Sequence, residues 1–336
     1  MIQKEYGGYL CLEKGDREYY KNTNEYSVRR YNAARYAIIE AIRDCGAKSV
    51  SVPNYMCPSV FDALDKYNIE YVKYSISGDF IVPTENVKSA DVIIVTNYFG
   101  IFSPIFFDGV IKTFGNVIFD NTQAFFSAPV LKDGVYNVYS PRKFVGVADG
   151  AYLITTRFCK AEGNLPEDRS AKRSSFLLNA AEMGTDANYE LSLAAEREIS
   201  SSGIMKMSAV TQYILSNIGY QRTKQIRKEN FAEVHSALGE YNELKELCDI
   251  ALSDDEICPM VYPLLLNSDY NKTREELLRN RIYIPQWWKA VLENNESSAF
   301  EKHLSVNLYP LPVDQRYTCD DMQKICGVIH SIIKQS

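Results

Sequence analysis

The sequence contains few of the residues from which metal and nucleic-acid sites are built. Only three of its 336 residues are histidine, and its eight cysteines include no Cys-x-x-Cys pair. Because structural zinc sites draw their ligands from such clusters, the sequence argues against a bound metal. The formal net charge is −6, whereas nucleic-acid-binding domains normally carry a basic patch. We therefore expect no nucleic-acid partner.

Long apolar runs are absent as well. No uninterrupted stretch approaches the roughly 20 residues that cross a bilayer, so no membrane span is expected. The first residues, Met-Ile-Gln-Lys-Glu-Tyr, lack the apolar core of a secretory signal. Scattered thiols without such a signal are typical of a reduced, cytoplasmic enzyme, and we expect that location. An apolar fraction of 46% over this length predicts one large domain and a smaller one.

Short β-branched and apolar runs alternate with helical patterns along the first half of the chain. This alternation predicts β-α-β units and a parallel sheet, with right-handed crossovers. The predicted strands lie at 48–52, 70–76, 91–97, 151–156 and 258–266 and at the start of the pieces 117–124 and 136–144, which end in polar residues; the predicted helices lie at 30–45, 58–67, 272–281 and 320–334.

The chain is predicted to divide into three parts. Residues 1–25 form an N-terminal arm, 26–205 a large domain and 206–336 a small α+β domain. The arm has two open interpretations, a segment that packs on a partner subunit and a mobile terminus. Residues 160–203 are polar and predict a solvated connector, whereas 207–247 predict one long helical stretch.

Polar side chains follow two of the predicted strands at the point where each strand ends. Asp120 and Gln123 follow one strand, and Ser140 and Lys143 follow the next. In open α/β sheets, ligands bind in the crevice beyond the carboxyl ends of the strands. A lysine that forms a Schiff base, together with a carboxylate that keeps a ring nitrogen protonated, is what pyridoxal phosphate enzymes require. These four residues therefore predict a pyridoxal phosphate site.

In order and spacing, the motifs resemble the DegT/DnrJ/EryC1/StrS family of fold type I aminotransferases. The resemblance implies an α/β large domain with a mostly parallel sheet, a smaller α+β C-terminal domain, and a homodimer with the cofactor near the subunit interface. It is carried by these segments: Asp120-x-x-Gln123, Ser140-x-x-Lys143, Asp149-Gly150, Arg35, the turn at 53–57, and the segment 314–317.

The resemblance also implies a role for each residue of the two motifs. Lys143 would form the Schiff base and, once released by the substrate amine, act as a general base. Asp120 would pair with the ring nitrogen, Gln123 would bind the phenolic O3′, and Ser140 would help to hold the phosphate.

Two further parts of the cofactor site lie nearer the N-terminus. The start of the helix predicted at 30–45 would present the amides of Ala34 and Arg35 to the phosphate. A flat side chain would stack on the ring. Tyr55 supplies an aromatic ring, but simple register puts Cys57 at that position, and both candidates stay open.

The sequence departs from the family in two places. Many members have a longer glycine-threonine loop near the first helix, where this chain has Asn-Ala-Ala-Arg. Members also contribute an asparagine from the neighbouring subunit, and register puts Ile204 at that position. The phosphate site is then expected to be completed differently, for example by Lys206.

The substrate is the least specified part of the prediction. The family's commonest activity implies amination of a nucleotide-linked keto-sugar, with glutamate as amino donor. Arg142, Tyr98 and Arg316 are candidate substrate contacts, although pairing with Asp314 or Asp320 is an equal alternative for Arg316. Alternative functions are an amino-acid or keto-acid aminotransferase, which needs only a carboxylate clamp, and a non-catalytic pyridoxal-phosphate-binding relative.

Two other reactions fit the motifs less well. Some members of the family are sugar dehydratases that carry histidine at the Schiff-base position, and this chain has Lys143 there. Penicillin-recognising enzymes also use Ser-x-x-Lys, but their Lys-Thr-Gly motif follows it. Here the nearest imitation, Lys112-Thr-Phe-Gly115, comes before Ser140. Transamination is therefore favoured.

Overall fold

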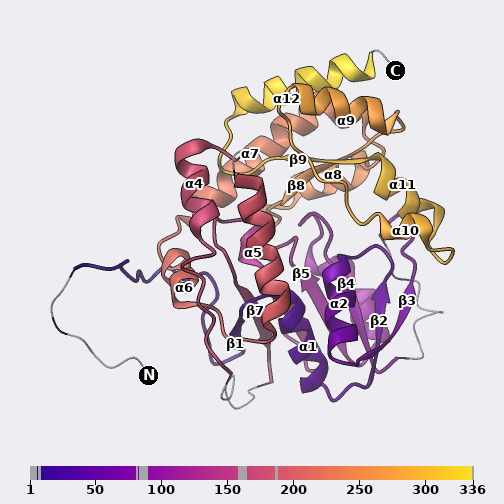
Figure 1. Ribbon diagram of the computed structural model, residues 1–336. Helices are drawn as coiled ribbons and strands as arrows, with labels where there is room; N and C mark the ends of the chain where they lie inside the picture. Colours follow the sequence, from indigo (N-terminus) through magenta and orange to yellow (C-terminus); the bar gives the residue numbers. More distant parts are fainter. Residues whose placement is uncertain are drawn as a thin grey trace.

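The computed structural model describes residues 6, 9–80, 82, 90–157, 165–185 and 188–334. Its central element is a seven-stranded sheet in the order β1-β7-β6-β5-β4-β2-β3 (Figure 1). Strands β2 to β6 run parallel, β7 is antiparallel to β6, and β1 is antiparallel to β7. The predicted class, α/β with a mostly parallel sheet, is confirmed.

The elements of this first half follow the predicted pattern closely. Their bounds are β1 Ser27–Tyr31, α1 Ala34–Asp44, β2 Ser49–Pro53, α2 Pro58–Lys66, β3 Glu70–Tyr74, β4 Val92–Thr96, α3 Asp108–Thr113, β5 Val117–Asn121, β6 Val135–Tyr139 and β7 Ala151–Thr155.

Both faces of the sheet are covered (Figure 1). On one face, Ile94 and Ile118 join an apolar cluster with Ile38 of α1. Their neighbours along the strands, Val95 and Phe119, belong to a second cluster, which includes the C-terminal half of the chain. Successive side chains of a strand point to opposite faces, so a strand that is apolar at every position is buried on both sides.

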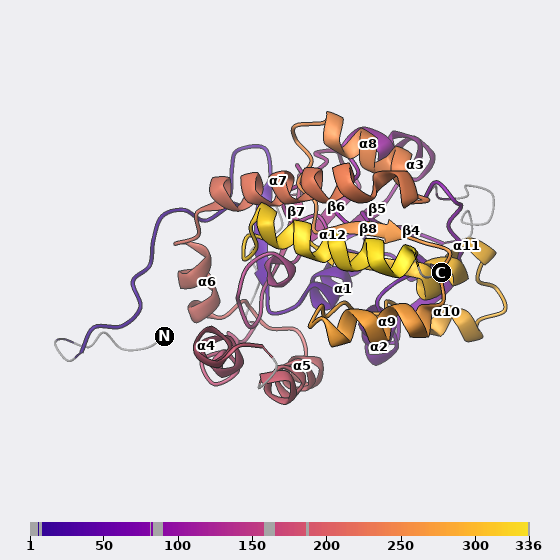
Figure 2. The same cartoon turned by 90° about the horizontal axis from the view of Figure 1, so that it is seen from above.

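The C-terminal half builds a helical layer around a two-stranded antiparallel sheet. Helices α7 and α12 lie side by side across it (Figure 2). The elements are α6 Ala209–Leu215, α7 Tyr220–Leu238, α8 Lys245–Ser253, β8 Val261–Leu265, α9 Tyr270–Arg279, α10 Ala290–Glu293, α11 Ala299–Asn307, β9 Leu308–Pro312 and α12 Cys319–Ile333. The predicted boundary at residue 205 falls just before α6, and the division into domains stays a prediction.

Three local predictions were wrong. The helix predicted at 30–45 begins only at Ala34, because Ser27–Tyr31 pairs with β7 as strand β1. The predicted connector at 160–203 contains two helices, α4 (Ser175–Met183) and α5 (Tyr189–Ser202). The helical stretch at 207–247 is broken into α6, α7 and the start of α8. A strand partner far along the chain decides the first outcome, and short breaks between helices decide the third.

The arm is described only in part, because residues 1–5 and 7–8 lie outside the described residues. Figure 2 shows the described start of the chain leading away from the body. The chain joins the body by Gly15, whose amide donates to the Ser216 hydroxyl at 2.9 Å. Tyr20 is then buried and donates to the Phe125 carbonyl at 2.6 Å. The arm therefore ends as a packed segment.

Asp149 is fully buried before β7, and its carboxylate organises the start of α6. Its Oδ2 accepts the Ser208 amide at 2.8 Å, and its Oδ1 accepts the hydroxyls of Ser208, at 2.7 Å, and Thr211. The side chain therefore ties the sheet to the C-terminal half.

Asp149→Ala is expected to lower the free energy of unfolding by about 3 kcal/mol, because it leaves buried donors without their charged acceptor. Urea unfolding measures the change. Asp255→Ala is the control, since its side chain is fully exposed, and it should change the same quantity by less than about 0.5 kcal/mol. Equal losses in the two variants would contradict this role.

Candidate active site

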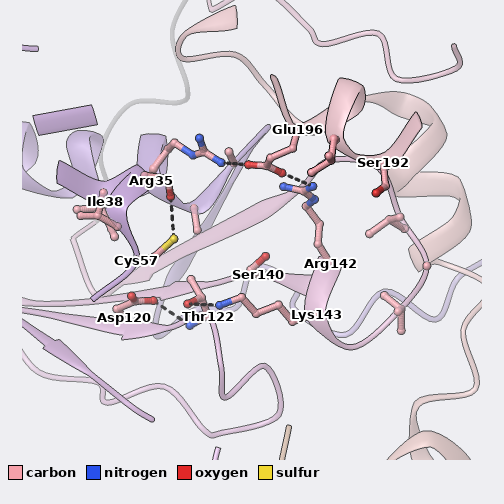
Figure 3. A pocket seen from close by; sticks show the side chains of 18 of the residues that line it. Arg35, Ile38, Cys57, Asp120, Thr122, Ser140, Arg142, Lys143, Ser192 and Glu196 are labelled. Carbon is pink, nitrogen blue, oxygen red and sulfur yellow. Dashed lines mark hydrogen bonds and ion pairs between the residues drawn. The ribbon is translucent and has the colours of Figure 1, made fainter. Parts of the chain in front are cut away.

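A cavity of about 460 Å³ opens beyond the carboxyl ends of β5 and β6, at the edge where the sequence predicted a ligand site. Figure 3 shows side chains from the sheet, α1 and α5 converging on it. The residues predicted from the sequence that line this cavity are Ala34, Arg35, Cys57, Asp120, Ser140, Arg142 and Lys143.

Asp120 is held at the cavity by its own backbone. It is the fourth residue of β5 and is 4% exposed. Its Oδ1 accepts the amide of Thr122 at 3.0 Å, a local turn that short acidic side chains favour at strand ends. Among the described residues no other hydrogen bond to this carboxylate is found, so its remaining acceptor capacity is available to a ligand in the cavity.

Lys143 reaches the same cavity from a tight turn after β6. Pro141 opens the 3-10 turn Pro141–Lys143 (η2), and its carbonyl accepts the amides of Phe144 and Val145, both at 2.9 Å. The amine of Lys143 lies 3.4 Å from the hydroxyl of Thr122 and points toward Asp120 (Figure 3). Ser140 precedes the turn and lines the cavity.

Two helices begin at the cavity without a side-chain cap. The N-cap residue of α1 is Ala33, which has no side chain that can accept a hydrogen bond, and the first turn of α1 contains no acidic residue. Helix α2 begins after Cys57, again with no capping hydrogen bond from the side chain. The first amides of a helix have no partner within it, and together with the helix dipole they favour an anion. The α1 start therefore suits a phosphate.

Glu196 of α5 lies between two arginines on the cavity wall (Figure 3). Its Oε1 pairs with Arg35, and its Oε2 accepts Arg142 at 2.7 Å. Burial alone would raise the pKa of the Glu196 carboxyl, but the guanidinium groups of Arg142 and Arg35 outweigh it and hold that pKa below its ordinary value. This triad ties α5 to the first helix and to the lysine turn.

A lowered folded-state pKa gives Glu196 a stabilising effect at neutral pH that is lost as the pH falls through that pKa, below the ordinary value of 4.5. Glu196→Gln is therefore expected to lower the free energy of unfolding by about 0.5–1 kcal/mol at neutral pH, and progressively less below pH 4.5. Denaturant unfolding across this range measures the difference. Glu190→Gln, exposed on the first turn of the same helix, is the control. A difference that grows in acid would refute the assignment.

Three predicted residues are not on the cavity wall. Tyr55 is fully buried and its ring packs on Trp288, with 4.5 Å between ring centroids. Tyr98 is also in the core, and its hydroxyl donates to the Tyr55 carbonyl at 2.7 Å. Gln123 is buried, and its Oε1 accepts the amide of Phe99 at 2.8 Å. Large rings gain most from full burial, so both tyrosines lie in the core, whereas Cys57 lines the cavity.

Ile204, at the position of the family's asparagine, and Lys206, which was expected to complete the phosphate site, both lie away from the cavity. Ile204 is partly buried against the cluster around α1. Lys206 forms isolated β-bridges with Tyr31 and Glu167. Neither residue lines the cavity in the described part of the chain.

A second cavity of about 600 Å³ adjoins the first and shares Arg142 and Lys143 with it. Its far wall comes from the C-terminal half and includes Arg227, Gln315 and Arg316. Arg316 pairs with Asp314, with nitrogen-to-oxygen distances of 2.8 and 2.9 Å. The pairing with Asp314 that the sequence left open is thus present, and it leaves Arg316 at the cavity.

Several residues of these walls were not predicted. Thr122 sits inside the Asp120 motif and could have been found there. Glu196 belongs to the segment predicted as a connector and Arg227 to the predicted long helical stretch, and no local pattern marks either of them. Gln315 lies inside the segment 314–317 that carries the resemblance, where only Arg316 was a candidate substrate contact.

The described residues contain no group of three or more His, Cys, Asp or Glu side chains that could hold a metal ion. They also contain no helix long and apolar enough to cross a membrane.

Comparison with known proteins gives a likeness in structure only. No family model and no curated protein matches the chain. Similar solved structures include a DegT/DnrJ/EryC1/StrS aminotransferase from Brucella abortus (TM-score 0.59, 13% identity, covering 90% of this chain and 85% of that one). Others are the sugar aminotransferase CalS13 from Micromonospora echinospora (TM-score 0.60, 13% identity, 90% and 87% covered) and PseC from Helicobacter pylori, an aminotransferase involved in the biosynthesis of pseudoaminic acid (TM-score 0.59, 13% identity, 92% and 87% covered).

These similarities extend over nearly the whole chain. The predicted fold type I architecture is therefore confirmed, and the resemblance to the aminotransferase family is confirmed at the level of the fold. At such low identity the likeness establishes the fold and leaves the chemistry to the residues of the site.

Proposed function

We propose that this chain is a pyridoxal-phosphate-dependent aminotransferase. The observation that carries the proposal is the convergence of Lys143, Asp120 and Ser140 with the uncapped start of α1 on one cavity. An amine, a carboxylate, a hydroxyl and free amides are the groups that such a cofactor requires. The fold shared with solved aminotransferases supports the same conclusion.

The residues present fit the cofactor. Lys143 would bind its aldehyde, Asp120 would hold a proton on the ring nitrogen, and Cys57 would lie against the ring. Ser140 and the amides at the start of α1 would hold the phosphate, because that helix end has no cap of its own. When bound, the cofactor supplies an electron-withdrawing ring that stabilises negative charge at the substrate α-carbon.

Two side chains of the chain, Lys143 and Asp120, then have separate roles in the reaction. The Lys143 amine, once freed by an incoming substrate amine, would act as a general base that moves the proton from the substrate α-carbon to the carbon of the cofactor's aldehyde group. Asp120 would keep its negative charge beside the ring nitrogen, fixed in place by the Thr122 amide. The turn that starts at Pro141 keeps the lysine within reach of both.

The substrates we propose are a nucleotide-linked keto-sugar as amino acceptor and glutamate as amino donor. The second cavity, about 600 Å³ beside Lys143, offers room for a large acceptor. Arg142 and Arg316 on its wall provide positive charge for a diphosphate or a carboxylate. Gln123 and Tyr98 keep no part in this proposal, because neither lines a described cavity.

A homodimer in the cytoplasm completes the proposal. Helix α4 is largely apolar, yet it contains no buried residue; Leu178, Met183 and Tyr189 of the α4–α5 segment are exposed, and Tyr189 lines the second cavity. Such a patch is typical of a subunit interface. Sedimentation of the cofactor-loaded protein at micromolar concentration should give twice the chain mass. A monomer under those conditions would remove the homodimer from the proposal.

A half-reaction assay tests the chemistry. Glutamate is added to protein loaded with pyridoxal phosphate, and loss of the yellow colour reports transfer of the amino group to the cofactor. Candidate acceptors are then added, and return of the colour identifies the one that is aminated. Return with simple keto acids alone would favour the keto-acid aminotransferase, and no response to any donor or acceptor would favour a non-catalytic relative.

A further inference from the structure

The residue directly after Lys143 is held by two side chains from the C-terminal half. The Phe144 carbonyl accepts Gln315 Nε2 at 2.6 Å and Arg227 Nη2 at 3.4 Å. The guanidinium carbon of Arg227 also lies 4.7 Å from the centroid of the Phe144 ring. The turn that carries Lys143 is therefore held by Pro141 within the turn, by Arg227 of α7 and by Gln315 of the segment before α12.

Arg227 is 1% exposed, and its hydrogen bonds go to neutral groups. Its Nε donates to Gln315 Oε1 at 3.1 Å, and its Nη1 donates to the carbonyls of Met260, at 3.0 Å, and Pro259, at 3.3 Å. Among the described residues no carboxylate forms an ion pair with it, and burial lowers its pKa. The Asp314 carboxylate, which pairs with Arg316, opposes this shift without forming an ion pair with Arg227. Placing a cation out of water without an ion pair costs several kcal/mol.

An apolar side chain of similar volume would fill this space at lower cost, so packing alone does not account for an arginine here. A guanidinium offers five donors in a rigid plane, and here they join four acceptors from three separate segments. One of those segments carries Lys143, and Arg227 itself lines the cavity that Lys143 shares. The geometry thus connects the C-terminal half with the position of the amine.

We propose that Arg227 is a positioning residue for Lys143, acting with Gln315 through the carbonyl of Phe144. Together they fix the backbone that follows the lysine, and so they set where the amine stands relative to Asp120 and the substrate. Small displacements of a reacting group have large kinetic effects, on the order of 10²-fold for about 1 Å. The expected effect on the rate of amino-group transfer rests on the proposed function. The expected change in the reactivity of the Lys143 amine rests on the structure alone.

The test compares Arg227→Lys, Arg227→Met and Gln315→Met with Arg222→Lys, a control exposed on the same helix. The kinetic readout is the rate of amino-group transfer from glutamate, split into kcat and KM. All three site variants should lose about 10–100-fold in kcat with KM changed less than about threefold, because the lysine and not the substrate is misplaced. The control should match the wild type.

Arg227→Lys separates geometry from charge. Lysine keeps the positive charge but cannot bridge Gln315, Met260 and Phe144 with one planar group. Full activity in Arg227→Lys would show that charge alone matters and would overturn the proposal. If Arg227→Met does not fold, Gln315→Met carries the test, since it removes the 2.6 Å donor and leaves the arginine in place.

A second readout needs no cofactor. Reductive methylation of the cofactor-free protein, followed by peptide mass spectrometry, gives the labelling rate of Lys143 relative to an exposed lysine such as Lys112. We expect this ratio to change at least threefold in the Arg227 and Gln315 variants. An unchanged ratio, together with an unchanged kcat, would refute the positioning role. Failure of the wild type to attach pyridoxal phosphate to Lys143 would instead refute the proposed function, whatever the variants do.

Discussion

Lys143→Ala is expected to abolish measurable amino-group transfer, with a loss of at least the 10²–10⁴-fold that a positioned general base contributes. Lys143 alone supplies a primary amine to the wall of the first cavity in the described part of the chain. Alanine removes both the covalent attachment of the cofactor and the base that moves the proton at the substrate α-carbon. Borohydride treatment of the loaded wild type should fix the cofactor to Lys143, and the variant should not be labelled.

The variant should nevertheless still bind the cofactor. Ser140, Asp120 and the amides of α1 remain, so equilibrium dialysis should detect weaker, reversible binding of pyridoxal phosphate. Lys112→Ala, which changes an exposed lysine outside the cavity, controls for general loss of charge and should be fully active. Labelling of another lysine, or normal turnover in Lys143→Ala, would show that the amine has been assigned to the wrong residue.

The parts of the fold that could be predicted from the sequence are those with a local signal. The stretch 92–95 is apolar at every position, and such a run predicts a central parallel strand without knowledge of its neighbours. Asp120 and Lys143 are charged residues that end similar apolar runs, at positions where strand packing does not require a charge. They therefore predicted the site. Both lie on the wall of the same cavity.

The parts that could not be predicted depend on distant partners. Ser27–Tyr31 is a strand because β7 pairs with it, and β7 lies more than a hundred residues further along. Helices α4 and α5 bury few residues, only Ala195 and Ile199 in α5, so their apolar periodicity is weak. The position of Tyr55 could not be predicted either, because its ring packs in the core on Trp288, which lies far along the chain.

Two of the unpredicted residues of the site, Glu196 and Arg227, act on a motif from another element. Glu196 holds Arg35 and Arg142 from α5, and Arg227 holds Phe144 from α7. A sequence motif names the groups that carry out the chemistry. The groups that hold them in place come from whichever elements the fold brings alongside, and their spacing in sequence is arbitrary.

Asp120→Asn is expected to keep cofactor binding and to lower the rate of amino-group transfer by about 10²–10³-fold, the effect of removing one fixed electrostatic partner from a buried site. Asparagine has nearly the same shape, and its side-chain oxygen can still accept the Thr122 amide that now donates to Asp120 at 3.0 Å. The substitution therefore removes the charge and keeps the geometry. Without a carboxylate beside it, the ring nitrogen would not stay protonated, and negative charge at the substrate α-carbon would be less stabilised.

Two comparisons decide whether charge is the cause. Asp120→Glu keeps the charge but lengthens the side chain, so it should retain more activity than Asp120→Asn if charge dominates and less if position dominates. Thr122→Ser keeps the backbone amide that holds Asp120 and should remain within about threefold of the wild type. The rate of amino-group transfer from glutamate and the affinity for pyridoxal phosphate are measured for each variant. An Asp120→Asn protein with undiminished turnover would mean that this carboxylate does not face the ring nitrogen, even though it stands on the cavity wall beside Lys143.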